Sequence, residues 1–165
     1  MKFATFLSSV LASAALVACG GGGSGTPAAT ATADTADKYV GTWTLCNPIS
    51  PNDPRSAKDT VTFTKTSAAT GSFVGHYDYY IGKNCAGTPS ELNTITGTFS
   101  IVGTNVIDAK TVDLINLSVS APVVQNQKSL AYINANTLLF GTYASPVDEN
   151  GYPTTLSTRT PYIKQ

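Results

Sequence analysis

The amino-acid sequence predicts an all-β protein with one eight-stranded, antiparallel, up-and-down barrel, and three observations support this prediction. After residue 37 the chain is rich in Thr, Gly, Val and Tyr, whereas Glu occurs only at Glu91 and Glu149. Such a composition favours strands over helices. Eight short runs have strand character, and the connections between them alternate in length. Eight antiparallel strands close into a barrel, which leaves no exposed sheet edge.

The strands are predicted from the alternation of apolar and polar residues along short runs. Residues 60–66 alternate strictly, and residues 72–81 place Phe73, Tyr77 and Tyr79 on one face. The alternation in residues 106–119 shifts near Leu114, which predicts a β-bulge there. The eight expected strands are residues 39–46, 60–66, 72–81, 93–102, 106–119, 129–133, 137–143 and 160–164.

The connections predict how the barrel is oriented. Three of them are short and carry Gly or Asn, as tight hairpins require: residues 67–71, 103–105 and 134–136. Four are long: residues 47–59, 82–92, 120–128 and 144–159. Because long and short connections alternate, an up-and-down barrel gathers the long loops at one end and the hairpins at the other. Changes in the hairpins, such as at Asn105 or Asn136, are expected to alter stability.

The N-terminus has the pattern of a secretory signal. Lys2 precedes an apolar stretch over residues 6–17, which is shorter than the roughly 20 residues that span a bilayer. Residues 16–20 read Leu-Val-Ala-Cys-Gly, which resembles the lipobox of bacterial lipoproteins. The resemblance implies that residues 1–18 are a cleaved signal peptide and that Cys19 is acylated, with palmitate among its chains, and anchors the protein to a lipid bilayer. The alternative is an ordinary secreted protein in which Cys19 stands by chance.

The resemblance also indicates where the protein resides. Gly20 stands where inner-membrane lipoproteins often carry Asp, so we expect anchoring in the outer membrane of the bacterial cell envelope, on its periplasmic face or at the cell surface. Residues 19–37 form a Gly/Ser/Ala/Thr linker without apolar periodicity. Residues 38–165 then suffice for one domain.

Two cysteines remain in that domain, Cys46 and Cys85. In an oxidising envelope such a pair predicts a disulfide. Free thiols are the alternative, and a metal site would need more ligands than His76, the only histidine, can add. Both cysteines fall at the long-loop end of the predicted barrel, so they can approach within the distance that a disulfide needs.

The first expected strand contains Gly41-x-Trp43, which resembles the opening strand of the calycin group, the lipocalins and avidins. Residues 60–64 and 71–77 are similar in pattern to the second and third strands of avidins, and the resemblance extends to about residue 81. It implies that Trp43 plugs the closed end of the barrel and that Gly41 allows close packing there.

No combination of residues predicts catalysis, so we expect neither an enzyme nor a cofactor. His76 shares a face with Asp78, but no nucleophile accompanies them. Asp108 and Asp113 are expected on opposite faces. Residues 148–151 resemble part of a calcium loop but lack its spacing, so a tight turn is expected. The net charge is zero and 12% of residues are charged, which argues against nucleic-acid binding.

The sequence therefore predicts a non-enzymatic binding module for a small apolar ligand or a peptide, with Arg55, Tyr79 and Tyr152 as candidate residues at the mouth formed by the long loops. The alternative is a periplasmic inhibitor or protein-interaction lipoprotein that acts through those loops. An interior cavity of a few hundred cubic ångströms would favour a small ligand. A filled interior with protruding, ordered loops would favour a protein partner.

Overall fold

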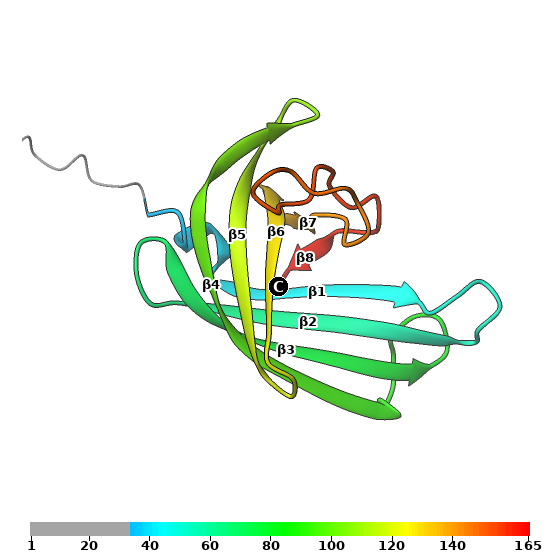
Figure 1. The fold of residues 1–165 in the computed structure, drawn as a ribbon. Coiled ribbons are helices and arrows are strands. Elements are labelled where there is room, and N and C mark those ends of the chain that lie inside the picture. The colour runs from blue at the N-terminus through cyan, green and yellow to red at the C-terminus, as the bar shows by residue number, and fades with distance from the viewer. Residues whose placement is uncertain (1–33) are drawn as a thin grey trace, which may run out of the picture. The chain divides into compact units, whose positions relative to one another are not determined.

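The computed structural model describes residues 34–165, so the expected signal peptide, Cys19 and most of the linker lie outside the described residues. Eight antiparallel strands form a closed barrel in chain order (Figure 1), which confirms the predicted fold class. The strands are β1 (Gly41–Pro48), β2 (Arg55–Lys65), β3 (Thr70–Ile81), β4 (Glu91–Ile107), β5 (Lys110–Ala121), β6 (Gln125–Asn134), β7 (Thr137–Phe140) and β8 (Tyr162–Lys164). They are preceded by one short 3₁₀ turn, η2 (Asp37–Tyr39).

All strands, the main core and the disulfide belong to one compact unit. Among the described residues, no helix has the length and apolar character needed to cross a membrane.

The core follows from the two-residue alternation of the strands. On β2, Val61 and Phe63 contribute to the core, whereas Thr60 and Thr62 face outwards. The buried residues of the main core share these inward positions or come from the segment before β1; they are Ala36, Tyr39, Trp43, Phe63, Phe73, Phe99, Ile101, Ile115, Ala131 and Leu138. Edge-to-face and tilted ring contacts join Tyr39, Phe63 and Phe99.

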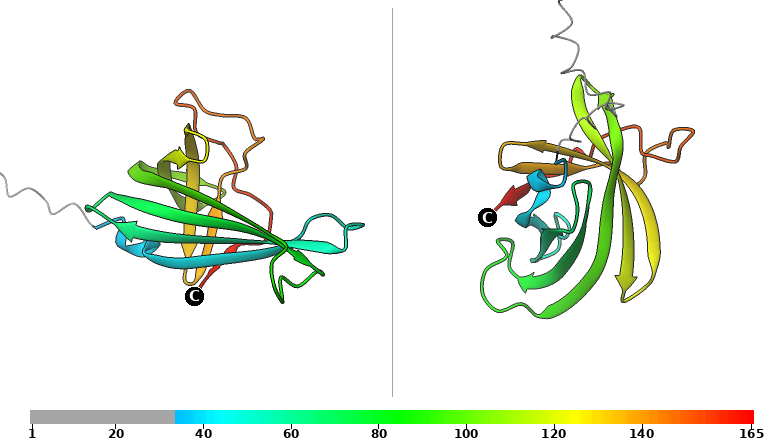
Figure 2. Two further views of the ribbon diagram at one scale, coloured as in Figure 1. Left: turned by 90° about the horizontal axis from the view of Figure 1, so that it is seen from below. Right: turned by 90° about the vertical axis from the view of Figure 1, so that its left-hand side faces the viewer.

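The segment before β1 closes the hairpin end of the barrel (Figure 2). The Ala36 N–H donates to the carbonyl of Ala68 in the β2–β3 hairpin at 2.9 Å. Tyr39 is fully buried and its hydroxyl donates to the carboxylate of Asp113. The Trp43 indole N–H donates to the Tyr39 carbonyl at 2.7 Å, so Trp43 packs directly against the residue that closes this end. Gly41 has φ +118°, a conformation that side chains disfavour.

Residues 34–37, predicted from the sequence as linker, pack against the barrel. Ala36 has no exposed surface, and the carboxylates of Asp34 and Asp37 both pair with the Lys65 ammonium. These contacts arise between residues about 30 positions apart, which local composition does not reveal.

The β4–β5 hairpin differs from the prediction. The expected turn at residues 103–105 is wrong, because β4 continues to Ile107 and the turn consists of Asp108 and Ala109. Both turn residues have positive φ, 48° and 60°, which suits the twist of a two-residue hairpin. A register shift does occur opposite Leu114, but it falls on β4 between Ile101 and Gly103.

The other end carries the connections 49–54, 82–90, 122–124 and 141–161, and we call this end the mouth. The third connection is shorter than expected, since β5 extends to Ala121 and β6 begins at Gln125. The mouth therefore has three long loops and one short one.

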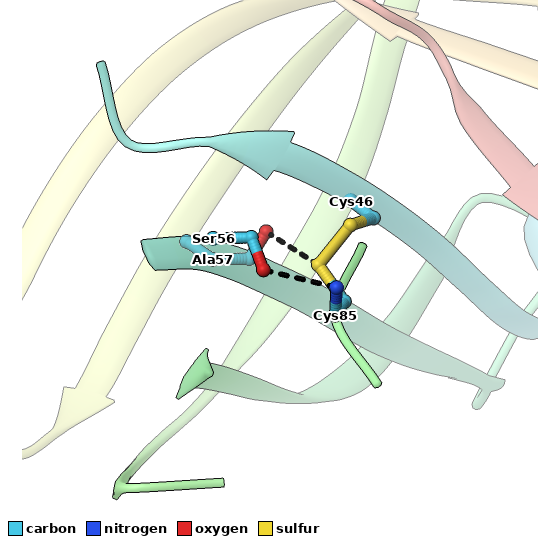
Figure 3. Close-up of a disulfide and its surroundings, with 4 residues drawn as sticks. All are labelled: Cys46, Ser56, Ala57 and Cys85. Atoms are coloured by element: carbon cyan, nitrogen blue, oxygen red, sulfur yellow. Dashed lines mark hydrogen bonds between the residues drawn. A yellow bond between two sulfur atoms is a disulfide. The ribbon is translucent and has the colours of Figure 1, made fainter. Parts of the chain in front are cut away.

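The disulfide between Cys46 and Cys85 is present, with a Cα–Cα distance of 6.1 Å, as predicted. It joins β1 to the 82–90 loop beside β2 (Figure 3). The Cys85 N–H donates to the hydroxyl of Ser56, which is fully buried. Ser56 lies on the face of β2 opposite to Ala57, so the disulfide fastens this loop to the outside of the barrel.

Candidate ligand-binding cavity

A cavity of about 520 Å³ opens at the mouth of the barrel. Its inner wall comes from inward positions of β1, β2, β3, β7 and β8, and its rim comes from the end of β1, the start of the 49–54 loop and both ends of the 141–161 loop. The inner wall includes Leu45, Ala57, Asp59, Tyr77, Phe140 and Tyr162. The rim includes Asn47, Ile49, Tyr143 and Arg159.

The position of each wall residue follows from the alternation that builds the core. Leu45 lies two residues after Trp43, Asp59 two residues before Val61, and Tyr77 four residues after Phe73. Large side chains fill the barrel near its closed end, whereas Ala57 has a small one at the corresponding position near the mouth. This change in side-chain size leaves room for the cavity.

Asp59 is the acidic residue in the wall of this cavity. One carboxylate oxygen, Oδ2, accepts a hydrogen bond from the Tyr162 hydroxyl at 3.2 Å. The other, Oδ1, is buried and has no hydrogen-bond partner in the described part of the chain. Burial raises the pKa of Asp59, while the Tyr162 hydroxyl and the Arg159 charge act in the opposite direction. The cavity thus contains a strong acceptor with unused capacity.

Two tyrosine hydroxyls accompany this carboxylate. Burial, the hydrogen bond with Tyr79 and the Asp59 charge raise the pKa of Tyr77 to about 12. Burial and the neighbouring Asp59 also raise the pKa of Tyr162. Both phenols therefore stay protonated at neutral pH. The ring of Tyr162 meets Phe140 edge-on, with centroids 5.8 Å apart.

Arg55 and Tyr79, two of the residues predicted for the mouth, come together at its edge. The Arg55 guanidinium lies over the Tyr79 ring, 5.9 Å from the centroid, and bonds to the Asp53 carboxylate at 2.9 Å. The arginine lowers the pKa of Asp53 through these hydrogen bonds. Neither Arg55 nor Tyr79 lines the 520 Å³ cavity, whereas Tyr77, whose ring meets that of Tyr79 edge-to-face, does.

The placement of Tyr152 at the mouth is wrong. Its side chain is 5% exposed and packs with Val112 and Leu130 in a second apolar cluster. These two residues alternate with inward-facing Asp113 and Ala131, so the cluster lies on the outer face of β5 and β6. The middle of the 141–161 loop therefore folds over the outside of the barrel, on the far side of these strands from β1–β3 (Figure 2).

Polar contacts fix this loop in place. The Tyr152 hydroxyl donates to the Asn116 side chain at 2.7 Å, and the Lys128 ammonium lies 5.2 Å from the Tyr152 ring centroid. Asp148 accepts the N–H groups of Asn150 and Tyr152 at 2.9 and 2.8 Å, which forms the tight turn that the sequence predicts.

The other polar candidates are separated. His76 is exposed and its Nδ1 lies 3.1 Å from the Thr94 hydroxyl, so its hydrogen bond goes to Thr94 and not to Asp78. Asp113 is buried against the Lys38 ammonium at 2.6 Å, whereas Asp108 lies in the exposed β4–β5 turn. Within residues 34–165 no group of three or more His, Cys, Asp or Glu side chains is arranged to hold a metal ion.

A second hollow, of about 560 Å³, is more open and lies on the sheet formed by β3–β6. Its surroundings are mainly hydroxyl and amide side chains, among them Thr98, Asn116 and Ser118. It contains no buried polar atom without a partner, so the mouth cavity is the stronger candidate.

Four residues of this cavity are not predicted from the sequence: Asp59, Phe140, Arg159 and Tyr162. Asp59 could have been predicted, because it continues the inward-facing alternation of Val61 and Phe63.

The comparisons with known proteins add nothing to the geometry: the sequence matches no family model and no curated protein, and the barrel matches no solved structure.

Proposed function

We propose that the protein is a bacterial envelope lipoprotein that binds a small, largely apolar molecule in the mouth cavity without transforming it chemically. The cavity volume of about 520 Å³ is the observation that carries this proposal. Sites for small molecules typically measure about 300–1,000 Å³, with apolar walls and a few polar groups. Leu45, Leu138 and Phe140 supply the apolar wall here, and an eight-stranded barrel has room for one such ligand.

The position of the N-terminal segment indicates at which end of the barrel a lipid tether would attach. Residues 34–39 enter at the hairpin end, where Thr35 and Ala36 bond to the Ala68 carbonyl. A lipid attached at Cys19 would reach the barrel through this end. Because this end is opposite to the mouth, a tether to the bilayer, which we propose to be the outer membrane, would leave the mouth uncovered.

One observation favours the alternative, a lipoprotein that binds or inhibits another protein through its loops. Val123, Val124 and Tyr143 are at least 70% exposed and lie in mouth connections. Exposed apolar side chains on ordered loops are common in protein interfaces.

Native mass spectrometry of the protein purified from its own envelope distinguishes these functions. We expect a co-purifying small molecule in the wild type and its loss in Ala57→Phe, which places a ring in the cavity. Ala68→Phe, at an exposed hairpin position, is the matched control and should retain the mass. A protein-sized adduct would favour the alternative. A small molecule that survives Ala57→Phe would contradict the assignment of the cavity.

A further inference from the structure

We propose that the ligand of the mouth cavity carries a protonated amine, which donates to the free carboxylate oxygen of Asp59. This inference rests on the proposed function and names the chemistry of its ligand. The first support is the buried, unpartnered Oδ1 of Asp59 in the wall of a cavity large enough to hold a ligand. A buried acceptor without a donor is rare in proteins and costs stability.

The second support is that four of the seven other aspartates in residues 34–165 are paired with a cation, whereas Asp78, Asp108 and Asp148 are not. Asp34, Asp37, Asp53 and Asp113 each have a lysine or arginine within ion-pair distance. Asp59 has no ion pair within residues 34–165, although it lies further inside the barrel than Asp53. A ligand ammonium would supply the missing counter-charge, and a hydrogen bond between two charged groups is stronger than one between neutral groups.

The charged and titratable groups around Asp59 are consistent with this partner. Tyr77 and Tyr162 face it from β3 and β8, and both carry neutral hydroxyls. Asp78, on the outer side of β3, adds negative charge and therefore favours a cation. Arg159 opposes one, but it is exposed at the rim, where solvent and salt screen its charge.

The rings that line the cavity favour an amine over an alcohol. Tyr77, Phe140 and Tyr162 surround the space near Asp59, and aromatic faces attract ammonium groups. A hydroxyl on the ligand would only duplicate the donors that the two tyrosines already present. The apolar remainder of the ligand would lie along Leu45, Ala57 and Leu138.

Isothermal titration of the domain with three probes of equal chain length tests the inference: n-octylamine, n-octanol and octanoate. We expect n-octylamine to bind best, with octanoate weakest because its carboxylate meets Asp59. Asp59→Asn should weaken the affinity for n-octylamine by about tenfold or more, as expected for the loss of one charge-assisted hydrogen bond. The affinity for n-octanol should not change. Arg159→Gln should strengthen the binding of n-octylamine only slightly, because solvent and salt already screen the opposing charge.

Asp78→Asn is the matched control. Asp78 also has a buried, unpartnered Oδ1 but lies on the outer side of β3, so this variant should keep the preference for the amine. Equal binding of all three probes, or a preference for n-octylamine that survives Asp59→Asn, would overturn the inference and leave the proposed function standing. If none of the probes binds to the wild type, both the inference and the small-ligand function are contradicted.

Discussion

Removal of the Cys46–Cys85 disulfide should destabilise the domain by about 4 kcal/mol, and the structure sets this magnitude. The two cysteines are 39 residues apart. In the chain-entropy model, opening a loop of this length gives the unfolded chain freedom equivalent to about 4 kcal/mol at 25 °C. For a domain of this size, 1 kcal/mol corresponds to about 3–5 °C, so the midpoint of thermal unfolding should fall by about 12–20 °C.

The assay compares the wild type with the double variant Cys46→Ser/Cys85→Ser by circular dichroism during heating. Reduced wild type is the control and should unfold at the same temperature as the double variant, since both lack the covalent bond. The Cys85 N–H bond to the buried Ser56 hydroxyl adds a local effect, because the 82–90 loop loses its attachment to β1. A double variant whose free energy of unfolding lies within about 1 kcal/mol of that of the oxidised wild type would refute the reasoning, because closing a loop this long should restrict the unfolded chain by much more than that.

Three further predictions concern single residues. Because the pKa of Asp59 is raised, the folded state binds more protons than the unfolded state, and wild-type stability should fall as pH rises through the Asp59 pKa. Urea titrations at several pH values should show a smaller fall in the free energy of unfolding for Asp59→Asn. An equal fall in both proteins would contradict this prediction. Tyr152→Ala should lower the free energy of unfolding by about 3–5 kcal/mol and expose residues 141–161 to proteolysis. Tyr152→Phe should lower it by only about 1 kcal/mol, because it loses only the hydrogen bond to Asn116. Equal losses of stability in the two variants would contradict the packing role of the ring. Cys19→Ser should abolish metabolic labelling with palmitate, and unchanged labelling would disprove the lipid anchor.

The strand order and the disulfide could be predicted because they depend on patterns repeated along the chain. The errors occur where local composition and long-range pairing disagree. Gly103 and Asn105 suggest a turn, yet they lie within β4, because Asp108 and Ala109 form the tighter hairpin. Residues 125–128 are polar and suggest a loop, but they pair with β5 near the mouth, where both faces of a strand can meet water.

The site was harder to predict than the fold. The sequence pattern does not single out Asp59, because the strict alternation that predicts this strand starts at Thr60, whereas β2 begins at Arg55. Tyr152 was misplaced because the length of a loop does not indicate which surface it covers. Val112 and Leu130 carried a signal, since strands with apolar residues on both faces must be covered on the outside as well as the inside.

The arrangement of the long loops explains why the cavity can be both open and well defined. The disulfide fastens the 82–90 loop to the outside of β1 and β2, and the Tyr152 cluster fastens the 141–161 loop to the outside of β5 and β6. Neither loop is therefore free to fill the barrel interior. Tyr39 and Trp43 seal the opposite end. A ligand can then enter only from the mouth, and the rigid attachment of both loops holds Arg159 and the rim in one position around it.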